Sequence, residues 1–236
     1  MFMRSLDKAI GGAIVAAMTL VASPAHATTT FAQFLQAIPQ ARIFIYSNTV
    51  GATKAKLSTS ALSNTVLVSD LGSLASPTLA TVNLVGTATA LPTVGSSISQ
   101  LFSGSMTFTL LAPQLGLSGW STDALTVTFT NAEFLASPGG QAPTLQSSAG
   151  STITYQSDFV DLSGVTDEDF SLSFSGASVP LSMVGTRLPN FRVSGSGTFA
   201  AVIPVPEPAS WSLMLVGFGL AGATLRTVRK QSASLA

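Results

Sequence analysis

The stretch ALTVTFT, residues 124–130, alternates apolar and polar side chains from Leu125 onward. Leu125, Val127 and Phe129 fall on one face of an extended chain, and the threonines between them fall on the other. A period of two with β-branched and aromatic residues predicts a half-buried β-strand. The same alternation predicts strands at 41–47, 65–70, 104–110, 151–157, 169–176 and 195–202.

Clusters of turn-forming residues separate these stretches. They contain Gly, Pro, Ser and Thr, and they lie at 91–97, 137–143 and 147–150. Many short strands joined by turns predict an all-β fold, and we expect a single β-sandwich of jelly-roll-like form. The apolar spacing of FAQFLQAI, residues 31–38, is closer to 3.6 and predicts a short helix. We expect irregular loops near 71–97 and 112–123.

The N-terminal residues 1–27 have the layout of a secretory signal peptide. Arg4 and Lys8 give it a positive start, and an apolar stretch follows. Ala25 and Ala27 then form an A-x-A site, in which small residues stand where signal peptidase requires them. We therefore expect export and cleavage after Ala27, which leaves a body of residues 28–203.

The mature chain would carry little catalytic chemistry. The single histidine, His26, departs with the signal peptide, and the sequence has no cysteine. The commonest general base, the thiolate nucleophile and the usual zinc ligands are then missing, so we expect no enzymatic activity. The body has eight acidic and five basic residues, hence a net charge of −3, and no basic patch for a nucleic acid.

An uncharged, mostly apolar segment lies near the C-terminus, at residues 209–225. As a helix its seventeen residues would extend roughly 26 Å, the low limit for a transmembrane span. Trp211 at one end suits the membrane interface, and the positive-inside rule places the opposite, basic end in the cytoplasm. That end is the tail 226–236, with Arg226, Arg229 and Lys230.

A proline-rich linker, residues 204–208, precedes this segment, and its prolines favour an extended chain just outside the membrane. It contains the triplet Pro206, Glu207 and Pro208. The triplet, the tryptophan three residues beyond it, the short apolar segment and the basic end together resemble the PEP-CTERM sorting signal. The closest form is the variant in which two residues separate PEP from tryptophan, and Ser212 departs from the alanine usual there.

This resemblance covers roughly residues 205–230 and implies a route for the protein, but no fold for the body. PEP-CTERM proteins occur in Gram-negative bacteria that make extracellular polysaccharide. The resemblance implies a precursor anchored in the inner membrane, with its C-terminus in the cytoplasm. A membrane enzyme, exosortase, would then release or transfer the body to the envelope or the medium. For the body we expect a structural or adhesive role in association with exopolysaccharide.

The acidic residues open a second class of function. Five of the eight in the body are Asp158, Asp161, Asp167, Glu168 and Asp169. Several carboxylates in one loop suit calcium, although the spacing matches no EF-hand, and a solvated loop is the plainer interpretation. The alternative function is therefore a calcium- or carbohydrate-binding module. A glycoside hydrolase is a third candidate, and it requires two carboxyl groups that face each other.

Overall fold

The computed structural model describes residues 28–48, 54–61, 64–202 and Phe218. The described residues form twelve β-strands. Their bounds are β1 Thr28–Gln36, β2 Phe44–Ser47, β3 Lys56–Thr59, β4 Thr65–Ser69, β5 Thr78–Ala88, β6 Thr93–Val94, β7 Ile98–Gly116, β8 Gly119–Ala136, β9 Thr144–Gln146, β10 Thr152–Gln156, β11 Thr166–Ser175 and β12 Phe191–Val202.

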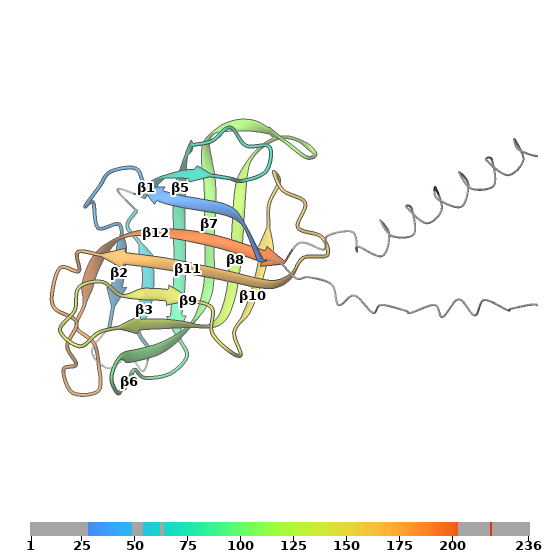
Figure 1. Cartoon of the computed structure of the whole chain (residues 1–236). Coiled ribbons are helices and arrows are strands. Elements are labelled where there is room, and N and C mark those ends of the chain that lie inside the picture. Colours follow the sequence, from blue (N-terminus) through green and yellow to red (C-terminus); the bar gives the residue numbers. More distant parts are fainter. Residues whose placement is uncertain (1–27, 49–53, 62–63, 203–217, 219–236) are drawn as a thin grey trace, which may run out of the picture. The chain divides into compact units, whose positions relative to one another are not determined.

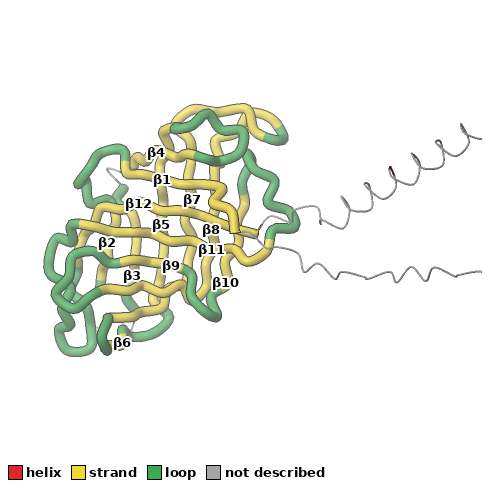
Figure 2. The backbone as a smooth tube through the Cα atoms, in the orientation of Figure 1, coloured by secondary structure: helices red, strands yellow, loops and turns green. Residues whose placement is uncertain are grey.

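These strands form one antiparallel sheet that closes into a barrel. The ring runs from β12 through β11, β9, β8 and β7 to β5, and then back to β12 through β4 and β1. A second path from β5 to β12 runs through β3 and β2. Either path gives a ring of eight strands. Figure 1 shows β1, β12 and β11 crossing in front of β5, β7 and β8, and Figure 2 shows the strands in yellow with the loops that join them in green.

The all-β prediction is confirmed, whereas the sandwich and jelly-roll form is wrong. Both architectures bury alternate residues of each strand, so the alternation seen in the sequence is the same for each. The difference lies in which strands pair. Strand β12 pairs with β11 along one edge and with β1 and then β2 along the other, and β5 also pairs along both edges. These pairings join the strands into one continuous ring, so the strands do not divide into the two packed sheets of a sandwich.

Aromatic side chains fill the interior of the barrel. The ring centroid of Phe34 lies 6.2 Å from that of Phe44, 5.1 Å from that of Phe108 and 6.1 Å from that of Phe199. Strand β12 makes room for them with glycine at an inward position. A Cβ added to Gly197 would lie 2.5 Å from the ring of Phe34. The absence of a side chain at Gly197 therefore leaves room for the Phe34 ring.

The predicted helix at 31–38 is wrong, because this stretch forms most of β1. Phe31, Ala32 and Phe34 are all buried, and the register of β1 against β12 shifts between Thr30 and Ala32. A bulge of this kind places two consecutive residues on the inner face. Its buried pair, followed by Phe34, imitates the spacing of an amphipathic helix.

The two segments predicted as irregular also contain strands. Strand β5 lies within 71–97, and the hairpin of β7 and β8 includes 112–123. In β5 the inward residues Ala80, Val82 and Leu84 are fully buried, but Leu79 and Val85 point outward and are 45% and 54% exposed. Apolar residues on both faces hide the period of two.

A hydrogen-bonded pair of polar side chains lies inside the barrel. The Tyr46 hydroxyl donates to Gln100 Oε1 at 2.8 Å, and Gln100 Nε2 donates to the Ala90 carbonyl at 3.0 Å. Burial raises the pKa of Tyr46 to about 12. Burial, followed by the charges of Asp169 and Glu168, also raises the pKa of Tyr155, whose hydroxyl donates to the Asp169 carbonyl.

Both tyrosines of the chain should resist ionisation in the folded protein. We expect tyrosinate absorbance to appear only well above pH 10, whereas in denaturant both phenols should titrate near pH 10. Because the pKa values of both phenols are higher in the folded state, the free energy of unfolding should not depend on their titration below about pH 10. Above that pH it should fall as the pH rises toward the folded-state pKa values. A spectrophotometric titration tests this, with Tyr46→Phe to separate the two residues. Ordinary titration in the native protein would contradict it.

Candidate functional sites

The residues predicted for sorting lie outside the described part of the chain. This holds for the sorting triplet and Trp211, for Arg226, Arg229 and Lys230 and for the signal-cleavage residues Ala25 and Ala27. The predicted transmembrane segment 209–225 also lies outside it, apart from Phe218, which is helical. Among the described residues, no helix has the length and hydropathy needed to cross a bilayer.

The five acids proposed for calcium fall into two groups around β11. Asp158 and Asp161 lie in the loop before it, where Asp158 Oδ2 accepts from the Ser121 hydroxyl at 2.5 Å. Asp161 Oδ1 accepts from the Ser163 N–H at 2.9 Å. Hydrogen bonds from the hydroxyl and the N–H of Ser163 lower the pKa of Asp161. Each of these two carboxylates therefore already accepts a hydrogen bond from a nearby serine.

The other three acids, Asp167, Glu168 and Asp169, follow Thr166 at the start of β11 and line a hollow of about 620 Å³. Asp169 accepts a hydrogen bond from the Ser147 hydroxyl. Even so, no group of three His, Cys, Asp or Glu side chains within the described ranges is placed to hold a metal ion. The calcium hypothesis thus finds no assembled ligand set in this part of the chain.

One outer face of the barrel carries rows of uncharged polar side chains. Across β9, β11, β12, β1 and β4, paired positions form the row Gln146, Ser171, Thr198, Gln33 and Ser69. The neighbouring row pairs Ser173 with Ser196, and the next pairs Ser175 with Ser194. Inward residues alternate with these, since Phe170, Leu172 and Phe174 are buried. The exposed face therefore offers hydroxyl and amide groups at regular spacing.

A pocket of about 970 Å³ opens where this face meets the connection between β1 and β2. Strand β12 pairs with β1 up to Ser196 and with β2 from Val193, so two residues between them lack a neighbouring strand on this edge. Side chains and loop backbone replace it. Gln36 Oε1 accepts from the Gly195 N–H at 3.2 Å, and the Arg42 N–H donates to Ser194 Oγ at 3.3 Å.

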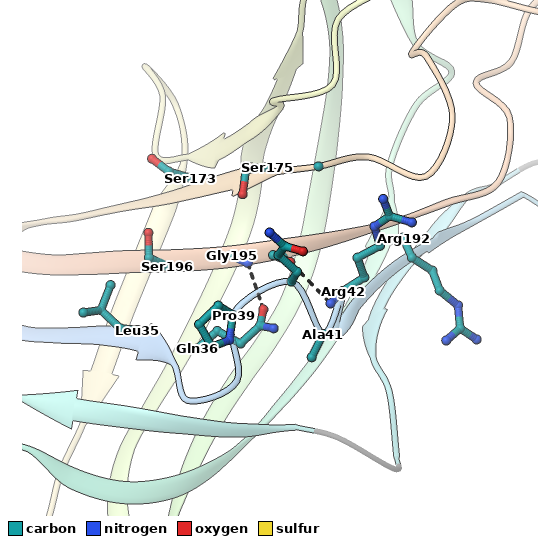
Figure 3. Close-up of a pocket in the computed structure, with 13 residues that line it drawn as sticks. Leu35, Gln36, Pro39, Ala41, Arg42, Ser173, Ser175, Arg192, Gly195 and Ser196 are labelled. Carbon is teal, nitrogen blue, oxygen red and sulfur yellow. Dashed lines mark hydrogen bonds between the residues drawn. The ribbon is translucent and has the colours of Figure 1, made fainter.

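Sequence reasoning did not single out this pocket. Its two charged residues, Arg42 and Arg192, stand far apart in the chain and line the same pocket because β2 pairs with β12. Figure 3 shows both arginine side chains at one end of the pocket and Leu35 at the other. The alternation of residues along β12 places Arg192 on the outer face. This was the one local signal, and it indicates that the residue is exposed but not that it lines a pocket.

Comparison with known protein families bears on the C-terminal residues. The PEP-CTERM protein-sorting motif matches residues 204–230. The chain carries a PEP-CTERM sorting signal. This confirms the resemblance drawn from the triplet, the tryptophan and the basic end. The PEP-CTERM signal implies an exported protein that is targeted to an exosortase through a membrane-anchored precursor. No curated protein and no solved structure matches the chain.

Proposed function

We propose that the barrel is a non-enzymatic structural or adhesive protein that associates with exopolysaccharide after export. The observation that carries this proposal is the uncharged polar face formed by β9, β11, β12, β1 and β4. Its rows of hydroxyl and amide groups both donate and accept hydrogen bonds, as sugar hydroxyls do. A face repeated over several strands suits a repeating polymer, because many weak contacts along one chain add up to avidity.

The surroundings of the carboxylates support a non-enzymatic role. The carboxyl oxygens of Asp70, Glu133 and Asp158 accept hydrogen bonds from Gln33, Ser99 and Ser121, respectively. A glycosidase needs one carboxylic acid that stays protonated, which requires a raised pKa. Asp161 does not fit that role, because hydrogen bonds from Ser163 lower its pKa.

The route of export combines the sorting signal with the proposed steps at each end of the chain. Signal peptidase would cleave after Ala27 and leave the N-terminus beside β1. The segment 209–225 would hold the precursor in the inner membrane, with its C-terminus in the cytoplasm, until the exosortase acts. The barrel then reaches the cell envelope or the medium. A calcium- or carbohydrate-binding module remains the alternative, and the hollow beside Asp167 is where calcium would be sought.

Sedimentation with exopolysaccharide from the producing cells tests the proposal. The full-length chain, purified in detergent, should sediment with the polymer and release no reducing ends from it. Thr198 is exposed at the centre of the five-strand row, so Thr198→Glu should weaken association by about threefold or more through desolvation and repulsion of the charge.

Thr154→Glu is the matched control, since Thr154 is an equally exposed threonine on β10 and belongs to another face. It should leave the sedimented fraction unchanged. The proposal fails if the wild-type chain does not associate with the polymer or if it cleaves the polymer. Equal loss in both variants would move the contact away from the named face.

A further inference from the structure

The pocket at the split between β1 and β2 differs from the rest of the polar face by its charge. Two of its lining residues are arginines, Arg42 and Arg192, and none is acidic. Both side chains are exposed. The body as a whole has more acidic than basic residues, so a pocket with two cations and no carboxylate stands out. Such a pocket attracts an anion.

Backbone hydrogen bonds hold the two arginines in place. The Arg192 N–H donates to Ser178 Oγ at 3.1 Å, and the Ser178 N–H donates to the Arg192 carbonyl at 3.0 Å. Arg42 donates its N–H to Ser194 Oγ and has a left-handed backbone with φ 47°. Non-glycine residues rarely adopt this conformation, and where they do it often serves a site. The chain thus bears a small conformational cost at Arg42, an exposed residue of this edge.

The other residues that line the pocket indicate what kind of molecule carries the anionic group. Hydroxyls of Ser173, Ser175, Ser194 and Ser196 come from paired positions of β11 and β12. Leu35, which is 63% exposed, gives the opposite end an apolar surface. A free phosphate or sulfate needs neither a hydroxyl row nor an apolar end. A sugar ring uses both, because its hydroxyls lie at the edge and its C–H groups form a face.

We propose that this pocket binds a carboxylate-bearing saccharide segment, a stretch of acidic polysaccharide that contains uronic acid. The guanidinium groups of Arg42 and Arg192 point in different directions (Figure 3), so each is placed to receive a carboxylate of its own, for which its planar donor pattern is suited. The four serines contact ring hydroxyls, and Leu35 contacts a C–H face. The volume of about 970 Å³ is at the upper end of the range for small-ligand pockets and accommodates more than one ring. This inference rests on the proposed association with exopolysaccharide and names the sugar class.

Calorimetric titration of the full-length chain in detergent tests the pocket with a defined probe. Tetragalacturonate should bind, and its fully methyl-esterified form, which keeps the rings but loses the charges, should bind about tenfold more weakly or worse. The double variant Arg42→Gln/Arg192→Gln should lose affinity for tetragalacturonate by a similar factor. Lys54→Gln/Lys56→Gln removes the same charge from exposed positions outside the lining, and it should bind like the wild type. Circular dichroism confirms that each variant is folded.

Two results of the calorimetric titration would overturn the inference. One is equal affinity of the wild type and the arginine double variant for tetragalacturonate, or of the wild type for the acid and its ester. The other is displacement of tetragalacturonate by equimolar inorganic phosphate, which would show a general anion site. Sedimentation with native exopolysaccharide separates this failure from that of the proposed function. If the arginine double variant sediments like the wild type, the pocket assignment fails alone; if the wild type does not sediment, the function fails.

Discussion

In producing cells, the Glu207→Gln variant is expected to accumulate as an uncleaved precursor in the membrane fraction, while the wild type is processed. Glu207 is the only charged residue from Pro204 to Leu225, and proline flanks it on both sides. An enzyme that recognises this stretch therefore has one charge to read, on a chain with little conformational freedom. Glutamine keeps the shape and removes the charge. Loss of a charge-assisted hydrogen bond should slow processing by about tenfold or more.

Pulse-labelling followed by mass spectrometry of the C-terminus measures this effect. Trp211→Ala should act in the same direction, because the tryptophan belongs to the same motif. Asp167→Asn is the matched control, since it removes one exposed acid from the barrel and asparagine tolerates the left-handed φ of 50° at that position. If both motif variants are processed at the wild-type rate, neither residue is a recognition element of the signal.

The second large effect is expected in the barrel interior, where Phe34→Ala should lower the free energy of unfolding by about 3–5 kcal/mol. Phe34 is 1% exposed, and its ring lies within 6.2 Å of three other phenylalanine rings. Gly197 opposite offers no side chain to fill the space left behind. The cavity should therefore persist, so the loss includes both the transfer of the ring and the empty volume.

Thermal unfolding followed by circular dichroism measures the loss, with a midpoint that falls on the order of 10 °C for a domain of this size. Leu35→Ala is the control from the next position of β1. Its side chain points outward, so its unfolding free energy should change by no more than about 0.5 kcal/mol. A Phe34→Ala midpoint equal to that of the control would show that the ring does not support the core.

Local pattern accounts for the strands and not for their closure. In β8 the inward residues Leu125, Val127 and Phe129 alternate strictly with threonine, and the strand was predicted. Closure depends on pairs such as Thr28 with Val202, which lie at opposite ends of the barrel's sequence. No period within a strand records its partner. The prediction for β1 failed for a different reason. The bulge at Phe31 gives the buried residues a spacing like that of a helix, although the segment is a strand.

The candidate sites follow the same division. The sorting signal is a contiguous motif, so it was recognised from the sequence, and the family model matches residues 204–230. The acidic residues are also close in the chain, but adjacency did not assemble them into a metal site among the described residues. The pocket is the opposite case: Arg42 and Arg192 line one pocket only because β2 pairs with β12. Its charge and its lining are products of the fold.

If the barrel has the proposed adhesive role, the course of β12 has a mechanical consequence. The strand begins at Phe191, next to the pocket residue Arg192, and ends at Val202, from which the chain continues toward the sorting signal. Tension between a bound polymer and a held tail would run lengthwise along β12. Its ladders with β1 and β11 would then be loaded in shear, with many hydrogen bonds strained together. Peeling a strand from its end breaks these hydrogen bonds one by one. The barrel would therefore resist a larger force applied along β12 than one that peels the strand away.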